Sequence, residues 1–128
     1  MGKASRDKGG RGEREVLKLL NDLGFPTDKP GGPEPLCYRC DQYRGGEEAG
    51  ADVQAEGFGV KLAVESKLRK RVNIKQAVIQ AERDAPEGYL PIARTREDRQ
   101  SAIISMPEWA FVELMQLVKR KHGWKDKT

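Results

Sequence analysis

Two acidic side chains and a lysine have the types and spacing that metal-assisted hydrolysis needs. Twelve residues separate Asp52 from the run Glu65-Ser66-Lys67. Alternate residues of a strand point to the same face, so Glu65 and Lys67 are expected to project together while Ser66 offers its backbone carbonyl. Carboxylate and carbonyl oxygens are hard ligands of the kind that Mg²⁺ binds. A lysine beside them can orient a water and stabilise charge on a phosphate.

A purely structural role for these charges is the alternative. Glu65 and Lys67 would then form an ion pair on a solvated sheet face. The preceding residues 60–64, Val-Lys-Leu-Ala-Val, are largely apolar, as in a central strand. Charges at the end of such a strand favour a functional site.

The elements that must position these residues follow from the apolar pattern. Residues 51–55 and 58–67 alternate apolar and polar side chains and predict two antiparallel strands joined at Glu56-Gly57. Before them, an amphipathic pattern predicts a helix over about 12–23, which Gly24 ends. After them, Asn73 is a candidate cap for a second helix, which Pro86 and Gly88 close.

The remaining third of the chain predicts two further strands and a last helix. Residues 89–93 and 102–104 are short apolar runs separated by a polar turn at 96–99. The run Ser105-Met106-Pro107-Glu108 has capping-box residues and starts a third helix. Its expected core face is Phe111, Leu114, Leu117 and Val118.

These elements predict one α/β or α+β domain with a central mixed β-sheet flanked by helices. A Gly- and Lys/Arg-rich stretch at 1–11 is interpreted as a flexible basic arm. The domain then spans 12–122 with a Pro/Gly-rich insertion at about 26–50, and residues 123–128 form a basic tail.

The composition says more about the class of protein than about its binding partner. The chain has 128 residues, 37% of them hydrophobic, which suits one domain, and no apolar run approaches the length of a membrane span. The N-terminus lacks the apolar stretch of a secretion signal, so a cytoplasmic location is expected. Net charge is only +4, but basic residues cluster. The clusters predict contact with a nucleic-acid backbone, and the candidate DNA-binding residues are Lys8, Arg11, Arg14, Arg69, Lys70 and Arg71.

The two cysteines, Cys37 and Cys40, have the spacing of half a zinc site. No second pair follows, and His122 is distant in the sequence, so zinc within one chain is disfavoured. Two copies could pool their pairs. Thiols that pack in the core, or a local disulfide, are the other interpretations.

The order of these motifs resembles the PD-(D/E)XK nuclease superfamily and, more closely, the archaeal-type Holliday junction resolvases. The Gly-rich start at 8–12, the step Glu13-Arg14-Glu15 and the exit Leu23-Gly24-Phe25 resemble the first helix of those resolvases, ahead of the acidic residue and the acidic-x-Lys strand. The resemblance covers roughly 8–25 and 50–85. The insertion at 26–50 departs from it.

The resemblance implies a homodimer that cuts four-way DNA junctions by paired, metal-dependent nicks. It implies that Asp52, Glu65, the Ser66 carbonyl and Glu13 bind Mg²⁺ or Mn²⁺, that Lys67 is catalytic, and that Gln80 on the second helix joins the site or contacts DNA. Without the resemblance, Glu13 is explained as an acid that favours a helix N-terminus, and Gln80 as an exposed helix glutamine.

Three other functions remain open at this point. A related nuclease acting on duplex ends or other branched DNA would use the same residues. A non-catalytic DNA-binding scaffold would keep the carboxylates for structure. A small zinc-assisted module would pair Cys37 and Cys40 across two chains.

Overall fold

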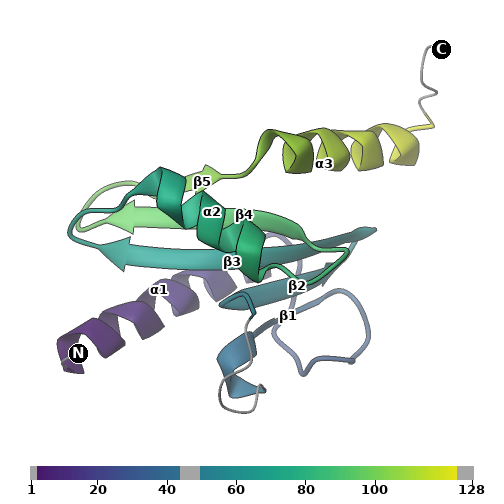
Figure 1. Cartoon of the computed structure of the whole chain (residues 1–128). Helices are drawn as coiled ribbons and strands as arrows, with labels where there is room; N and C mark the ends of the chain where they lie inside the picture. Colours follow the sequence, from purple (N-terminus) through teal and green to yellow (C-terminus); the bar gives the residue numbers. More distant parts are fainter. Residues whose placement is uncertain (1–2, 44–49, 124–128) are drawn as a thin grey trace.

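The described residues, 3–43 and 50–123 of the computed structural model, form a five-stranded mixed sheet with helices around it (Figure 1). In chain order the elements are α1 (Lys3–Asp22), β1 (Leu36–Arg39), the short 3₁₀ helix η1 (Cys40–Gln42), β2 (Val53–Gly57), β3 (Val60–Arg69), α2 (Ile74–Asp84), β4 (Leu90–Glu97), β5 (Ile103–Ser105) and α3 (Glu108–Lys121). The mixed α+β architecture predicted from the sequence is confirmed.

The strands lie side by side in chain order, β1-β2-β3-β4-β5. β3 and β4 run parallel, because α2 crosses over between them, and the other neighbours pair antiparallel. The predicted hairpin is confirmed, with Val53 paired to Val64. Its predicted turn at Glu56-Gly57 is wrong, because Gly57 still pairs with Val60 and the chain turns at Phe58-Gly59. The predicted cap of α2 is confirmed as well, since the Asn73 side chain accepts a hydrogen bond from the Gln76 backbone N–H.

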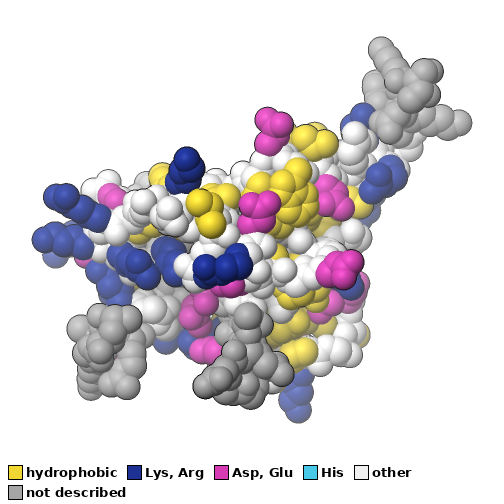
Figure 2. All heavy atoms as spheres, in the orientation of Figure 1, with side chains coloured by type: hydrophobic (Ala, Val, Ile, Leu, Met, Phe, Trp, Pro, Cys, Tyr) yellow, Lys and Arg dark blue, Asp and Glu magenta, His cyan; other side chains and the backbone are white. Residues whose placement is uncertain are grey.

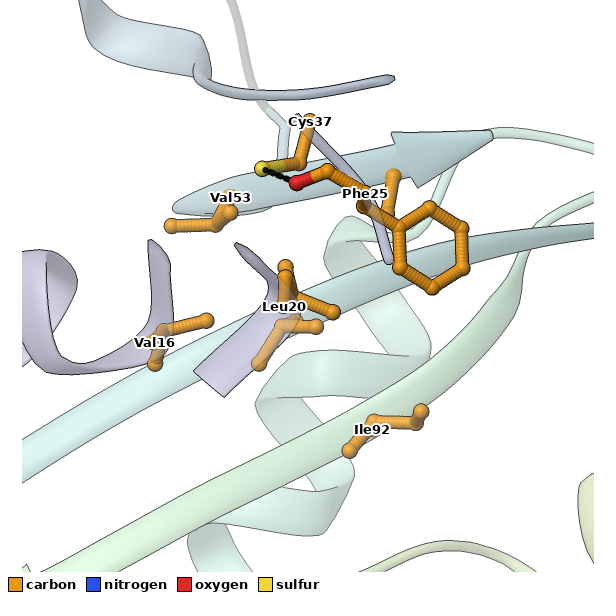
Figure 3. Packing of buried hydrophobic residues seen from close by; sticks show 8 residues of the cluster. Val16, Leu20, Phe25, Cys37, Val53 and Ile92 are labelled. Atoms are coloured by element: carbon orange, nitrogen blue, oxygen red, sulfur yellow. Dashed lines mark hydrogen bonds between the residues drawn. The ribbon is translucent and has the colours of Figure 1, made fainter. Parts of the chain in front are cut away.

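Helices cover both faces of the sheet. Val16 and Leu20 of α1 pack with Val53, Val64 and Ile92 in the main core (Figure 3). On the other face, small side chains of α2 pack against Ala93 of β4, so this helix lies close to the sheet. β3, between the two layers, is thus buried over much of its length, which explains its apolar sequence.

A strand lies inside the segment that the sequence predicts to be irregular. β1 pairs with β2 at one edge of the sheet, and Leu36, Cys37 and Tyr38 are buried there. Four residues after a proline are too short to show a strand period. The tertiary pairing with β2 creates β1. Residues 44–49 of the predicted insertion lie outside the described residues, as do 1–2 and 124–128, which include most of the predicted basic tail.

The first helix is longer than predicted: α1 begins at Lys3 rather than near Gly12, so residues 3–11 belong to it and do not form a separate arm. Gly12 has a packing role, because a Cβ atom at this position would lie 2.8 Å from Ser66 Oγ and 3.1 Å from Leu68 Cβ. The glycine therefore lets α1 approach β3 closely.

The predicted core face of α3 is only partly right for the single chain, because Leu114 and Leu117 are half-buried but the other two residues are not. Phe111 and Val118 are exposed, and Ala110 is the residue of α3 that is buried. The capping box does not form either: Pro107 occupies the cap position without a side-chain hydrogen bond. α3 lies beyond the β5 edge of the sheet (Figure 1), where little of the chain covers it.

An ion-pair cluster joins the middle of α1 to the end of β4. Glu15 accepts from Arg94 Nη1 at 2.6 Å, from Arg96 Nε at 2.9 Å and from Arg96 Nη2 at 2.7 Å. These hydrogen bonds lower the pKa of Glu15 from its ordinary value of 4.5 to about 2, with the one from Arg96 as the largest cause. Glu15 therefore fixes the helix that carries Glu13.

No helix in the described part of the chain has both the length and the apolar character to cross a bilayer.

Replacing Gly12 with Ala tests the close approach of α1 to β3. The added methyl group has to displace Ser66 or move the helix, so we expect the free energy of unfolding to fall by about 1–3 kcal/mol. Gly9→Ala is the matched control, because nothing lies within 4 Å of its Cβ position. That change should stabilise the helix by about 0.5–1 kcal/mol. Urea unfolding of both variants measures the difference, and equal effects would contradict the packing role.

Replacing Glu15 with Gln tests the cluster on β4. Because the folded-state pKa is depressed, the stabilisation is present above the unfolded pKa and is lost as the pH falls through the folded one. We expect Glu15→Gln to lower the free energy of unfolding by about 1–3 kcal/mol at neutral pH. The difference from wild type should vanish as the pH falls from about 4.5 toward 2, the range between the ordinary and the shifted pKa. Unfolding curves at several pH values measure it, and a pH-independent difference would contradict the assignment.

Candidate active site

A buried carboxylate lies at the centre of the candidate site. Glu65 follows the apolar part of β3 and is 2% exposed. Its Oε1 atom accepts a hydrogen bond from Gln80 Nε2 of α2 at 2.8 Å and lies 3.4 Å from Lys67 Nζ. Its Oε2 atom is buried and receives no hydrogen bond from the described residues. A polar atom in that position needs a proton or a cation.

The second carboxylate of the site belongs to Asp52, immediately before β2. Its Oδ2 atom accepts a hydrogen bond of 2.8 Å from the Ser66 backbone N–H, which fixes it next to β3. Burial raises the pKa of Glu65 to about 8, with the Asp52 charge as the next cause, while the Lys67 ammonium partly opposes both. The structure thus brings together Asp52, Glu65 and Lys67, as the sequence predicts.

Asp52 and Lys67 line a cavity of about 650 Å³ that mixes acidic and basic side chains. Asp52 and Glu13 supply carboxylates and Lys67 an ammonium group. The rest of its wall comes from the first turns of α1 and from the end of β3: Lys8, Gly9, Ser66, Leu68, Arg69 and Lys70.

Glu13 lies in the same cavity but is engaged differently from the prediction. Arg39 of β1 forms an ion pair with it, with Nε and Nη2 each 2.9 Å from Glu13 Oε1. Burial raises the pKa of Glu13, and the charge of nearby Asp52 raises it further, whereas the hydrogen bond from Arg39 lowers it. The sequence favours a solvated loop charge for Arg39 over a contact to the site, because this residue lies in a strand that only its pairing with β2 reveals.

The donor set fits a magnesium ion with few protein ligands. Among residues 3–43 and 50–123, no group of three or more His, Cys, Asp or Glu side chains is arranged to hold a metal. Mg²⁺ is commonly bound by only one or two carboxylates, with waters and substrate phosphates completing the octahedron. Asp52 and Glu65 supply such a pair, and the unsatisfied Glu65 Oε2 is the oxygen that a cation would satisfy. The roles predicted for Glu13 and for the Ser66 carbonyl stay predictions.

Basic side chains extend from the site over neighbouring surface. Lys8 also lines a second cavity of about 470 Å³, together with Arg11, Arg96, Asp98 and Arg99. Arg14, Arg69, Lys70 and Arg71 are exposed. Figure 2 shows Lys and Arg side chains gathered at the end of the molecule where β3 and β4 end. Of the predicted DNA-binding residues, Gln80 differs: it points its amide at Glu65 and so positions the carboxylate.

Both cysteine thiols are buried, and they belong to separate clusters. Cys37 Sγ donates to the Phe25 carbonyl oxygen at 3.2 Å inside the main core (Figure 3). Cys40 packs with Leu36 and Tyr38, and its Sγ donates to Gln54 Oε1 at 3.3 Å. The thiols are not joined in a disulfide, and burial raises the pKa of Cys37. The environment favours the packing interpretation of this pair.

No family model, curated protein or solved structure matches the chain. The site's own geometry therefore carries the functional argument.

A double-mutant cycle on Arg39 and Glu13 tests the ion pair at the cavity. Arg39→Ala leaves the half-buried Glu13 carboxylate without its cation, and we expect the free energy of unfolding to fall by about 1–3 kcal/mol. In the Glu13→Gln background the same change should have a clearly smaller effect, because no charge remains to be compensated. Chemical denaturation of the four proteins measures the coupling. Additive effects would show that the two side chains act separately.

Proposed function

We propose that this protein is a metal-dependent, structure-selective endodeoxyribonuclease that resolves four-way DNA junctions by paired nicks. The observation that carries the proposal is a buried Glu65 with an unsatisfied oxygen next to Lys67 and Asp52, two residues that line a cavity together with basic side chains. Such a combination suits hydrolysis of a phosphodiester and has few uses in a purely structural network.

The chain's own residues each have a task in this chemistry. When bound, a divalent cation would activate a water and stabilise charge on the scissile phosphate. Asp52 and Glu65 would hold that cation. Gln80 orients Glu65, and the Ser66 backbone N–H orients Asp52. The Lys67 ammonium, held 3.4 Å from Glu65 Oε1, is placed to stabilise negative charge on the reacting phosphate.

The surface around the site supports a nucleic-acid substrate. Arg69 and Lys70 line the cavity itself, and Lys8 connects it with the neighbouring basic cavity that Arg11 and Arg99 line. Side chains of this kind contact phosphates and read the path of the backbone instead of the base sequence. A protein that recognises the backbone path can select a branched structure. The four-way junction is chosen among branched substrates from the resemblance of the first helix and the acidic motifs to the junction resolvases.

Cleavage assays on defined DNA structures test this function. We expect paired nicks near the branch point of a labelled four-way junction with Mg²⁺ or Mn²⁺ and none with EDTA. Asp52→Asn should abolish the nicks, and Lys67→Met should slow them about 100-fold or more, because charge stabilisation at the phosphate is lost. Asp22→Asn is the matched control, since it makes the same chemical change on the exposed side of α1.

The substrate panel separates the alternatives. Cutting of linear duplex or flap DNA at rates equal to the junction would replace the resolvase with a related nuclease. Tight, salt-sensitive binding without any cutting would favour a non-catalytic DNA-binding scaffold. Calorimetric titration with Mg²⁺ provides a readout besides activity, because binding should be lost in Asp52→Asn and kept in Asp22→Asn.

A further inference from the structure

An exposed apolar stripe runs along α3 on the side turned away from the chain. Phe111 is 54% exposed, Val112 48%, Met115 41% and Val118 43%. Their spacing of one, four and seven residues places them on one side of a helix. Four large apolar side chains in one stripe form a contiguous patch, and such patches on a protein surface mark interaction sites.

α3 is held in place on its other sides, so the stripe is a fixed feature of the surface. Near the start of the helix, Trp109 Nε1 donates to Glu82 Oε2 of α2 at 2.7 Å. At its end, Lys121 Nζ donates to the Phe58 carbonyl oxygen at 3.5 Å and lies over the Phe58 ring. Ala110 is buried, and Leu114 and Leu117 are half-buried. Phe111, Val112, Met115 and Val118 are left facing outward.

The charges along α3 indicate which kind of partner fits the stripe. Glu108 lies in the first turn, and Lys119, Arg120 and Lys121 lie in the last turn. A helix rotation of 100° per residue puts Glu108 and Lys119 on the same flank of the apolar stripe. If two copies of α3 pair antiparallel near Leu114, the acidic start of each faces the basic end of the other. The helix dipoles then also oppose each other favourably. This surface is complementary to itself.

We propose that the α3 stripe binds the α3 stripe of a second copy of this chain, in an antiparallel pair about a two-fold axis. Phe111 of one copy then packs near Val118 of the other, Met115 lies close to the axis, and Glu108 faces Lys119 of the partner. Such an isologous contact closes the assembly at a dimer. The inference does not rest on the proposed nuclease activity, although a dimer would carry the two active sites that paired nicks need.

Oligomeric state in solution tests the interface. Sedimentation equilibrium over a range of micromolar and higher concentrations should give twice the mass of one chain for wild type. Met115→Lys should give the mass of one chain, because it buries two like charges near the axis. Leu23→Lys is the matched control and should stay dimeric, since Leu23 is an exposed apolar residue just after α1. Circular dichroism verifies that each variant is folded.

A charge exchange tests the antiparallel arrangement separately. Glu108→Lys should shift the monomer–dimer equilibrium toward monomer at low salt, and the combination of Glu108→Lys with Lys119→Glu should restore the dimer. The Asp52→Asn protein should dimerise like wild type, which separates a failure of this interface from a failure of the proposed activity.

Three results would overturn the proposal. Wild-type protein could be monomeric at all concentrations, which would leave the stripe for a different partner. Met115→Lys could remain dimeric. The dimer could instead be lost on Ile104→Lys while Met115→Lys keeps it, which would place the contact at the β5 edge, where Ile103 and Ile104 are also exposed.

Discussion

The buried carboxylate of Glu65 is the constraint on which the candidate site depends. A charged oxygen enclosed in a protein is unfavourable unless something compensates it. Gln80 satisfies one oxygen and Lys67 lies beside it, while Asp52 raises the pKa of Glu65 through its like charge and through a side-chain hydrogen bond. An arrangement that places two carboxylates together and leaves one oxygen unsatisfied opposes stability. Such an arrangement is typical of functional sites, which keep side chains that the chemistry needs although they destabilise the fold.

Apart from Lys67, which lies on the same strand, the groups around that carboxylate come from other elements of the fold. The parallel crossover from β3 through α2 to β4 sets Gln80 over β3, and the β2–β3 hairpin carries Asp52 to the adjacent strand. The close approach of α1 at Gly12 places Glu13 in the same cavity. The site is thus assembled where three elements meet one central strand. A shift of any of them would move a side chain away from the cavity.

Two glutamates of α1 have different roles: one lies at the candidate site and the other anchors the helix to the sheet. Glu13 pairs with Arg39 beside the cavity, whereas Glu15 holds Arg94 and Arg96 at the end of β4. Lys8, one to two turns earlier, forms an ion pair with Asp98 and lines both basic cavities. The helix therefore positions an acidic residue at the candidate site and also contributes a basic side chain to the surface around it. The apolar stripe of α3 serves neither of these, and we propose that it binds a second copy of the chain.

The sequence by itself determined the order of the elements and the main acidic site. The hydrophobic periods of the two helices and the alternation in the hairpin are local properties, and so is the two-residue spacing that directs Glu65 and Lys67 to one face. Tertiary structure decided the rest. β1 and its Arg39 exist because β2 offers an edge, Gly12 matters because β3 lies against it, and the apolar face of α3 stays exposed because no other element reaches it. Each of these depends on contacts between residues far apart in the chain, which local periodicity does not encode.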